Sequence, residues 1–255
     1  MSAKVEALFH YPIKGLSAQA LDQVTLRPGQ GFPLDRVFGF GRPGSGFDPE
    51  NPRPLPKGKF VVLARDAGLA LLDTRFDTDA ETLRITQEGL TRTHDLSTDA
   101  GCIEAAQSIA DALGYDADMV PTLHNAAPHR FTDVSVVSPE MMNAISLINI
   151  DSVAHFADTI GYPISPARFR GNILFSGMPA FDELKMIGEV LRIGDVALKL
   201  VQRTRRCPAT QVNLETGERD IDVPKELNET YGHSDMGVYA EVLEGGVIMP
   251  GDAIT

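Results

Sequence analysis

The stretch Val190-Leu191-Arg192-Ile193-Gly194-Asp195-Val196-Ala197-Leu198-Lys199-Leu200-Val201 decides the fold class of this chain. Two runs rich in Val, Ile and Leu flank the pair Gly194-Asp195, and such runs are typical of β-strands. Glycine adopts the positive φ angle that a tight turn needs, and aspartate caps the turn with its own side chain. The stretch therefore predicts a β-hairpin.

Short strand-like runs recur on both sides of this hairpin. Turn signals separate them at short intervals, whereas a doubly wound parallel sheet requires a long helical crossover between its strands. The pattern therefore favours a β-barrel over a doubly wound parallel sheet. The runs lie at 5–10, 23–26, 36–40, 83–86, 173–175, 238–242 and 246–249.

A few short helices are predicted between these strands. Apolar residues have helical spacing over 99–113, and Gly114 ends that helix. A strand at 134–137 is predicted to lead into a helix at 138–145, because Ser138 and Pro139 suit the first two positions of a helix. A third helix is predicted at 152–160. The whole pattern indicates a mainly β fold of the α+β class.

Between the predicted strands at 36–40 and 60–64, the segment 41–56 holds eight glycines and prolines. Proline lacks a backbone donor and glycine weakens regular structure, so this density predicts a surface loop.

Length and charge narrow the class of function. The chain has 255 residues, enough for one large domain or two closely packed domains. Its 35 acidic and 23 basic residues give a net charge of −12, which disfavours nucleic acids and anionic membranes as partners. No apolar stretch is long enough to span a membrane, and the start does not resemble a signal peptide. Two cysteines are too few for a disulfide framework, so a cytoplasmic location is expected.

Cys207 is the strongest candidate for chemistry. It follows Arg205 and Arg206 directly, and neighbouring cations favour a thiolate over a thiol. A thiolate binds a soft metal or carries a persulfide sulfur. The alternative is that Cys207 is a small buried apolar residue without chemical function. The sequence assigns no role to the second cysteine, Cys102.

Three further segments carry residues suited to an anionic ligand. Lys14 follows a predicted strand in the run Tyr-Pro-Ile-Lys, and Arg36 ends the run Leu-Asp-Arg. Arg170 and Asn172 belong to Arg-Phe-Arg-Gly-Asn at 168–172, where guanidinium groups could grip a phosphate or carboxylate. The alternative for each is an ordinary solvated side chain. Zinc-protease, paired-cysteine, serine-hydrolase and P-loop motifs do not occur in the sequence.

Together these motifs resemble the MOSC superfamily, named for the C-terminal domain of molybdenum-cofactor sulfurase. The chain is similar to the amidoxime-reducing members of that family. The resemblance implies an N-terminal MOSC-associated β domain at 1–95 and a MOSC-type β-barrel domain at 96–255. The matching segments are 11–14, 34–36, 168–172, 205–207, 215–218, 231–234 and 251–252.

The resemblance also implies a cofactor and the residues that hold it. The cofactor is the molybdenum cofactor, a molybdopterin with a phosphate tail, and Cys207 is its metal ligand. Lys14, Arg36, Arg170 and Asn172 match family residues that contact the cofactor, and Arg206 beside the cysteine is grouped with them. A soft thiolate suits molybdenum, and Lys and Arg suit a phosphate.

Two functions follow from the resemblance. The first is an oxidoreductase that reduces N-hydroxylated small molecules and receives electrons from a separate donor protein. The second is a sulfur carrier, in which Cys207 holds a persulfide supplied by a cysteine desulfurase and passes it to a metal centre. The sequence favours the first and leaves the second open.

Overall fold

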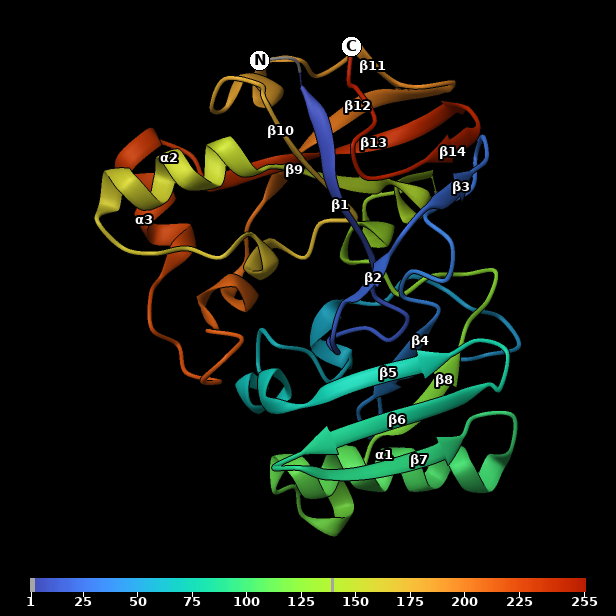
Figure 1. Ribbon diagram of the computed structural model, residues 1–255. Coiled ribbons are helices and arrows are strands. Elements are labelled where there is room, and N and C mark those ends of the chain that lie inside the picture. The colour runs from blue at the N-terminus through green and yellow to red at the C-terminus, as the bar shows by residue number, and fades with distance from the viewer. Residues whose placement is uncertain (1–2, 139) are drawn as a thin grey trace.

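A seven-stranded sheet, curled into a half-barrel, forms the upper part of the molecule (Figure 1). The computed structural model describes residues 3–138 and 140–255. Neighbouring strands are antiparallel except for one parallel pair, β9 and β10. In spatial order the strands are β11 (Val190–Ile193), β12 (Val196–Arg205), β13 (Asp235–Glu244), β9 (Ile145–Asn149), β10 (Ile173–Ser176), β1 (Lys4–His10) and β2 (Gln19–Leu21).

The predicted hairpin is confirmed. Strands β11 and β12 pair antiparallel, with Ile193 opposite Val196. Gly194 in the turn between them has φ 58°, in the left-handed region that glycine adopts without strain. Both Ile193 and Val196 are fully buried, so the hairpin contributes directly to the core of the half-barrel.

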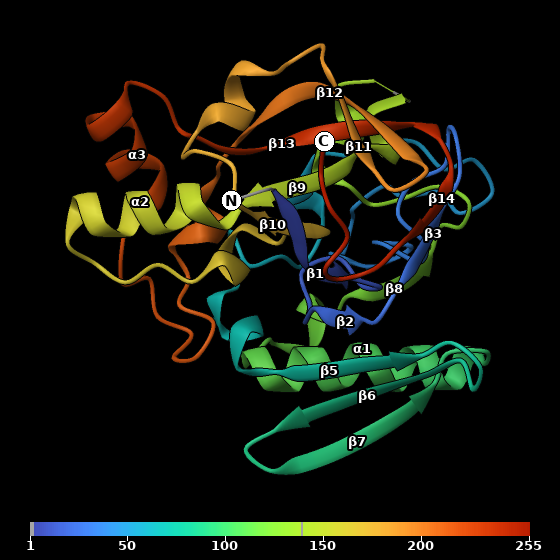
Figure 2. The same cartoon turned by 45° about the horizontal axis from the view of Figure 1, so that its top comes forward.

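The first strand of the chain closes the sheet against its last residues. Strand β1 pairs with β10, and the Val5 amide donates to the Asp252 carbonyl at 2.9 Å. The Ile254 amide donates in turn to the Ala3 carbonyl at 2.8 Å. The two ends of the chain therefore lie side by side, as both cartoon views show (Figures 1 and 2).

The lower part of the molecule is a second, smaller β unit with one helix. Helix α1 (Asp99–Leu113) runs along one face of a three-stranded sheet (Figure 2). Gly114, at φ 66°, ends it as predicted, and Thr98, which was not predicted, caps its start. The strands of this part are β4 (Phe38–Gly41), β5 (Asp73–Asp77), β6 (Thr82–Gln87), β7 (Leu90–Asp95) and β8 (Thr122–Asn125).

Gly101 allows α1 to approach β7 closely. A Cβ atom added to Gly101 would lie 1.9 Å from the Asp95 carbonyl oxygen, far inside van der Waals contact. Gly101→Ala is therefore expected to destabilise the protein by about 2 kcal/mol, because backbone must move to relieve the overlap. Urea unfolding measures the change, with exposed Ala100→Ser as the control. A Gly101→Ala protein as stable as wild type would contradict this packing.

Two helices lie beside the half-barrel. Helix α2 (Ile150–Ile160) packs against β9, β10 and β13, and it ends at Gly161 as predicted. Helix α3 (Val223–Tyr231) starts at Asp222, whose carboxylate accepts from the Lys225 amide, and it was not predicted. The remaining strands, β3 (Val24–Leu26) and β14 (Gly246–Ile248), pair with each other.

The prediction for 134–145 is wrong. Two short 3-10 turns, Asp133–Val136 and Glu140–Asn143, precede strand β9, which begins where the predicted helix was to end. All five residues of β9 are buried between β13 and β10, and a run buried on both faces shows no alternation in sequence. Val136 and Val137, read as strand residues, are instead exposed. Pro139 lies outside the described residues.

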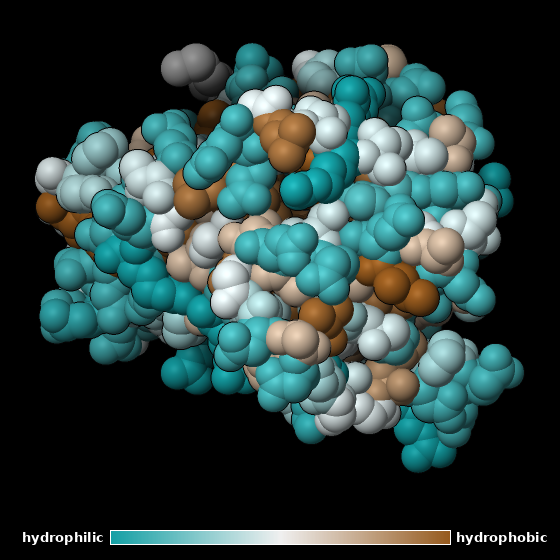
Figure 3. Space-filling view, turned by 90° about the horizontal axis from the view of Figure 1, so that it is seen from below, coloured by the Kyte–Doolittle hydropathy of each residue, from teal (hydrophilic) through white to brown (hydrophobic). Residues whose placement is uncertain are grey.

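The mainly β fold class predicted from the sequence is confirmed. Of the loop predicted at 41–56, Gly41 ends strand β4, and residues 42–56 contain neither helix nor strand. Seen from below, hydrophobic residues are scattered across a mostly hydrophilic surface (Figure 3). None of the helices within residues 3–138 and 140–255 has the length and apolar character needed to cross a bilayer.

Candidate functional site

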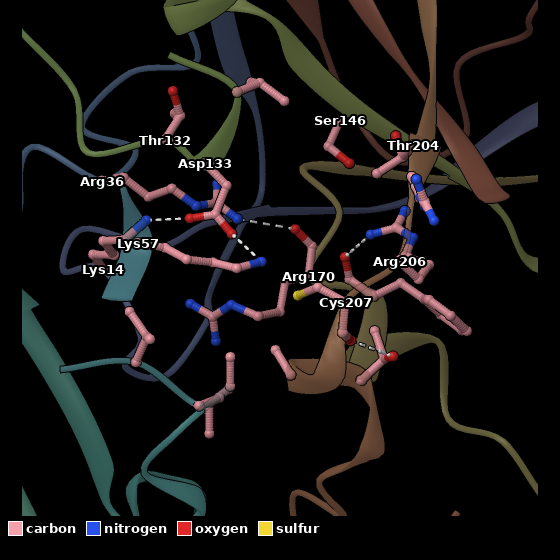
Figure 4. Close-up of a pocket in the computed structure, with 18 of the residues that line it drawn as sticks. Lys14, Arg36, Lys57, Thr132, Asp133, Ser146, Arg170, Thr204, Arg206 and Cys207 are labelled. Atoms are coloured by element: carbon pink, nitrogen blue, oxygen red, sulfur yellow. Dashed lines mark hydrogen bonds and ion pairs between the residues drawn. The ribbon is translucent and has the colours of Figure 1, made fainter. Parts of the chain in front are cut away.

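A cavity of about 310 Å³ lies where the half-barrel meets the N-terminal β unit (Figure 4). Segments far apart in sequence line it, including the loop after β1, the residues 62–64 and the turn after β12. Every site residue predicted from the sequence belongs to this lining, namely Lys14, Arg36, Arg170, Asn172, Arg206 and Cys207. The structure thus brings these residues together, and their roles stay predictions.

Cys207 lies two residues beyond the end of strand β12. Strand β12 ends at Arg205, and Cys207 is the extended residue before a 3-10 turn, Pro208–Gln211. The Thr210 amide and hydroxyl both donate to the Cys207 carbonyl, at 3.0 and 2.9 Å. These bonds fix the backbone of Cys207 while its thiol, free and half-buried, faces the cavity.

Arg206 is held behind the cysteine by backbone carbonyls. Its guanidinium donates to the Met236 carbonyl at 2.8 Å and to the Phe169 carbonyl at 2.9 Å, and it stacks on the Phe169 ring. Burial lowers the pKa of Arg206 to about 10, although Tyr239 and Cys207 oppose that change. The side chain therefore remains a cation at neutral pH, fixed beside Cys207.

Two lysines share one carboxylate at the opposite wall. The buried Lys14 ammonium donates to the Phe131 carbonyl at 2.7 Å and forms an ion pair with Asp133. The Lys57 ammonium lies 3.5 Å from the other oxygen of Asp133. Burial would raise the pKa of Asp133, but these two ammonium groups lower it to about 2. Asp133 is thus a carboxylate throughout the neutral range.

The two lysines differ in their surroundings. Burial lowers the pKa of Lys14, and Asp133 opposes this change. Burial also acts to lower the pKa of Lys57, but Asp133 and Cys207 outweigh it, and the net change is upward. Figure 4 shows the Lys57 ammonium and the Cys207 sulfur pointing into the same part of the cavity.

Asp35 connects several of the residues beneath the cavity. This buried carboxylate accepts from the Tyr11 amide at 2.9 Å and from the Asn172 side chain at 3.0 Å, and it pairs with Arg36. The guanidinium carbons of Arg36 and Arg170 lie 4.7 and 4.2 Å from the centre of the Tyr11 ring. Asp35 therefore links β1 to both arginine-bearing segments.

Arg170 brings hydrogen-bonding capacity that the protein leaves unused. Burial lowers its pKa to about 10, Tyr11 opposes this change, and Arg36 adds to it. Its Nη2 atom is buried and has no partner among the described residues, and the same holds for the Thr204 hydroxyl in the cavity wall. Buried donors without partners are costly, so a polar ligand in the cavity would remove this cost.

Asn172 has both ends of its amide occupied. Its nitrogen donates to the Phe9 carbonyl at 3.1 Å as well as to Asp35, and its oxygen accepts from the Ser146 amide at 3.1 Å. Asn172 thereby joins strands β1 and β9 beneath the cavity. The prediction that it contacts a ligand remains untested.

Sequence reasoning missed other residues of the lining, among them Lys57, Asp133 and Tyr239. Lys57 follows the proline-rich loop, and nothing in that composition indicates a ligand site. Tyr239 lies in a predicted strand, where alternation does not show which face lines a cavity. No cluster of three or more His, Cys, Asp or Glu side chains arranged for a metal ion is found within the described part of the chain.

Arg219 joins the two walls of the cavity. Its guanidinium donates to the Leu63 and Ala64 carbonyls at 3.1 and 2.9 Å, and to the Pro208 carbonyl at 2.9 Å. Leu63 and Ala64 line one wall, and Pro208 follows Cys207 in the other. Arg219 therefore fixes the N-terminal wall relative to the cysteine.

Arg219→Met is expected to destabilise the protein by about 2 kcal/mol, because it removes charge-assisted hydrogen bonds to three carbonyls. It is also expected to speed alkylation of Cys207, since the wall beside the thiol is released. Urea unfolding and the rate of reaction with iodoacetamide measure these effects. The control is Arg65→Met, which removes one exposed contact to the Gly58 carbonyl. Equal alkylation rates in wild type and Arg219→Met would show that Arg219 does not hold the two walls of the cavity together.

Comparison with known proteins gives one family and several relatives. The model of the MOSC domain matches residues 127–255. Mitochondrial amidoxime-reducing component 1 of Xenopus laevis is 28% identical over 153 residues, which are 55% of this chain and 44% of that protein. The match thus spans less than half of that relative's length.

Two solved structures are also similar. The YUAD protein from Bacillus subtilis is 16% identical with a TM-score of 0.44, covering 100% of this chain and 94% of its own. YiiM from Geobacillus stearothermophilus is 23% identical with a TM-score of 0.34, and the match covers 44% of this chain and 52% of YiiM.

Proposed function

Because the chain belongs to the MOSC domain family, we propose that its cavity binds the molybdenum cofactor and that the protein reduces N-hydroxylated compounds. The similarity to an amidoxime-reducing component supports the reaction class. One observation carries the proposal: Cys207 and Arg170, whose Nη2 atom has no partner among the described residues, line the same cation-lined cavity.

The residues present fit this cofactor in charge and in donor type. A thiolate at Cys207 would ligate molybdenum, a metal suited to soft sulfur ligands. Arg170, Arg36, Lys14 and Arg206 would bind the phosphate tail and the polar edge of the pterin, because guanidinium and ammonium groups pair strongly with phosphate. When bound, the cofactor would supply the redox chemistry. An acidic protein needs such a local cluster of cations to retain an anion.

The chain's own residues would prepare the site for this reaction. Removal of oxygen from an N-hydroxyl group consumes two electrons and two protons and releases water. The electrons would come from a separate donor protein, which we expect to meet this protein in the cytoplasm. Arg206 and the bonds from Thr210 would hold Cys207 in place, while Asp133 would keep the Lys14 ammonium charged in its buried position.

The test uses wild-type protein purified from a host that makes the cofactor. We expect near-stoichiometric molybdenum and catalytic reduction of an aromatic amidoxime to the amidine with a reduced viologen as electron donor. Protein that folds normally but contains no molybdenum would contradict the proposal.

A sulfur carrier is the second candidate. The free, half-buried thiol of Cys207, with the Lys57 ammonium nearby, would suit a persulfide. Incubation with a cysteine desulfurase and its substrate should then add one sulfur atom to wild type but not to Cys207→Ser, as measured by intact mass. The absence of this adduct on a molybdenum-loaded protein would exclude the carrier function.

A further inference from the structure

Residues 42–59 form a strap whose two ends are tied together at the rim of the cavity. The Arg42 amide donates to the Lys59 carbonyl at 2.9 Å, and the Arg42 side chain donates to the Phe60 carbonyl at 3.2 Å. Arg42 also forms a largely buried ion pair with Asp66. The base of the strap is therefore fixed, although the strap itself has little regular structure.

An aromatic side chain anchors the strap to the cavity wall. The Phe47 ring lies 4.9 Å from the Phe131 ring and 4.9 Å from the His124 ring, measured between centroids. Phe131 is the residue whose carbonyl accepts from Lys14, and Asp133 follows two residues later. The strap and the segment that carries Asp133 therefore pack as one unit.

This anchoring directs Lys57 toward the cavity and Lys59 away from it. Lys57 begins a 3-10 turn, Lys57–Lys59, on the returning limb of the strap. Its side chain is 36% exposed and lines the cavity, whereas Lys59 is exposed and outside the lining. Lys57 thus stands at the rim, between bulk water and Cys207 (Figure 4).

Three other cations of the cavity have partners in the protein, and a fourth, Arg170, keeps an Nη2 atom that is unpaired among the described residues but buried. Lys14 bonds to a carbonyl and to Asp133, and Arg36 bonds to Asp35 and to the Arg170 carbonyl. Arg206 bonds to two carbonyls. Lys57 lies 3.5 Å from a carboxylate that Lys14 also pairs with, and it also interacts with the Cys207 side chain. An ammonium has three donors, so Lys57 retains hydrogen-bonding capacity at the rim.

We propose that Lys57 selects substrates that carry an anionic group, such as a carboxylate, and binds that group at the rim of the Cys207 cavity. The inference rests on the proposed function for the place where the substrate binds. An anion there would replace the long contact to Asp133, and Lys14 would remain as the partner of Asp133. Since the whole chain is acidic, a local cation is needed to attract such a substrate.

The test measures binding of two aromatic amidoximes that differ by a single ring carboxylate. Calorimetry is carried out on cofactor-loaded wild type, Lys57→Met, Lys57→Arg and the control Lys59→Met. Wild type and Lys59→Met are expected to bind the carboxylate compound about tenfold more tightly than the neutral one, as for a charge-assisted hydrogen bond. Lys57→Met should lose this preference without change in its affinity for the neutral compound. Lys57→Arg should retain it.

Three outcomes would overturn the role of Lys57. They are equal binding of both compounds by wild type, an unchanged preference in Lys57→Met, and a lower molybdenum content in Lys57→Met, which would assign the ammonium to the cofactor. Turnover is measured separately. Wild type that reduces neither compound but prefers the carboxylate would contradict the proposed function and support the role of Lys57. Wild type that reduces both compounds equally well and shows no binding preference would support the proposed function and contradict the role of Lys57.

Discussion

Replacement of Cys207 by serine is expected to remove bound molybdenum and to lower reductase activity by more than about 100-fold, since even changes in the residues around a metal ligand cost 10- to 100-fold. Serine offers a hard oxygen of high pKa in place of a soft thiolate. The side chain is half-buried and its backbone is held by Thr210, so the fold should tolerate the change. Metal analysis and amidoxime reduction measure the two effects.

Cys102→Ser is the matched control for this substitution. Cys102 lies on α1, outside the cavity lining, where it packs against the core of the N-terminal unit and its thiol donates to the Leu96 carbonyl. The control should keep both molybdenum and activity. Cys207→Ser protein with wild-type molybdenum content would show that the metal is held without this thiol, and the ligand assignment would fail.

Replacement of Asp35 by alanine should destabilise the protein by about 3–5 kcal/mol, the usual cost of breaking a buried ion pair from one side. The Tyr11 amide, the Asn172 side chain and Arg36 would all lose their shared acceptor in a position that water does not reach. Urea unfolding measures the loss. The same variant should bind the cofactor poorly, because Arg36 and Asn172 lose their fixed orientation.

The control for Asp35→Ala is Asp22→Ala, which removes an exposed carboxylate and should change stability by less than about 0.5 kcal/mol. A loss below about 1 kcal/mol in Asp35→Ala would show that the floor of the cavity does not depend on this carboxylate.

Local features of the sequence predicted much of the fold. The Gly194-Asp195 turn, the helical spacing in α1 and the glycines that end α1 and α2 are signals carried within a few residues, and the structure confirms them. Strand β9 was misread because its burial depends on β13 and β10, which lie more than 20 residues away along the chain. Helix α3 was missed because its apolar residues, such as Val223 and Leu227, are few among charged ones.

The candidate site was predictable where a residue belongs to a family motif. Lys14, Arg36, Arg170, Asn172, Arg206 and Cys207 were chosen in this way, and one cavity contains them all. Lys57 and Asp133 could not be found, because their place in the cavity depends on how the strap packs against Phe131. The predicted division into 1–95 and 96–255 stays a proposal, and the packing of α1 and β8 with the N-terminal core bears on where its boundary lies.

The pairing of β1 with β10 and with the residues around Asp252 has a consequence for biosynthesis. Strand β1 cannot complete its hydrogen bonds until the residues around Asp252 have been translated. Tyr11 and Lys14, which follow that strand, are fixed only at the same moment. Contacts of such large sequence separation slow folding, so we expect the nascent chain to reach its ligand-binding form only once the segment around Asp252 can pair with β1.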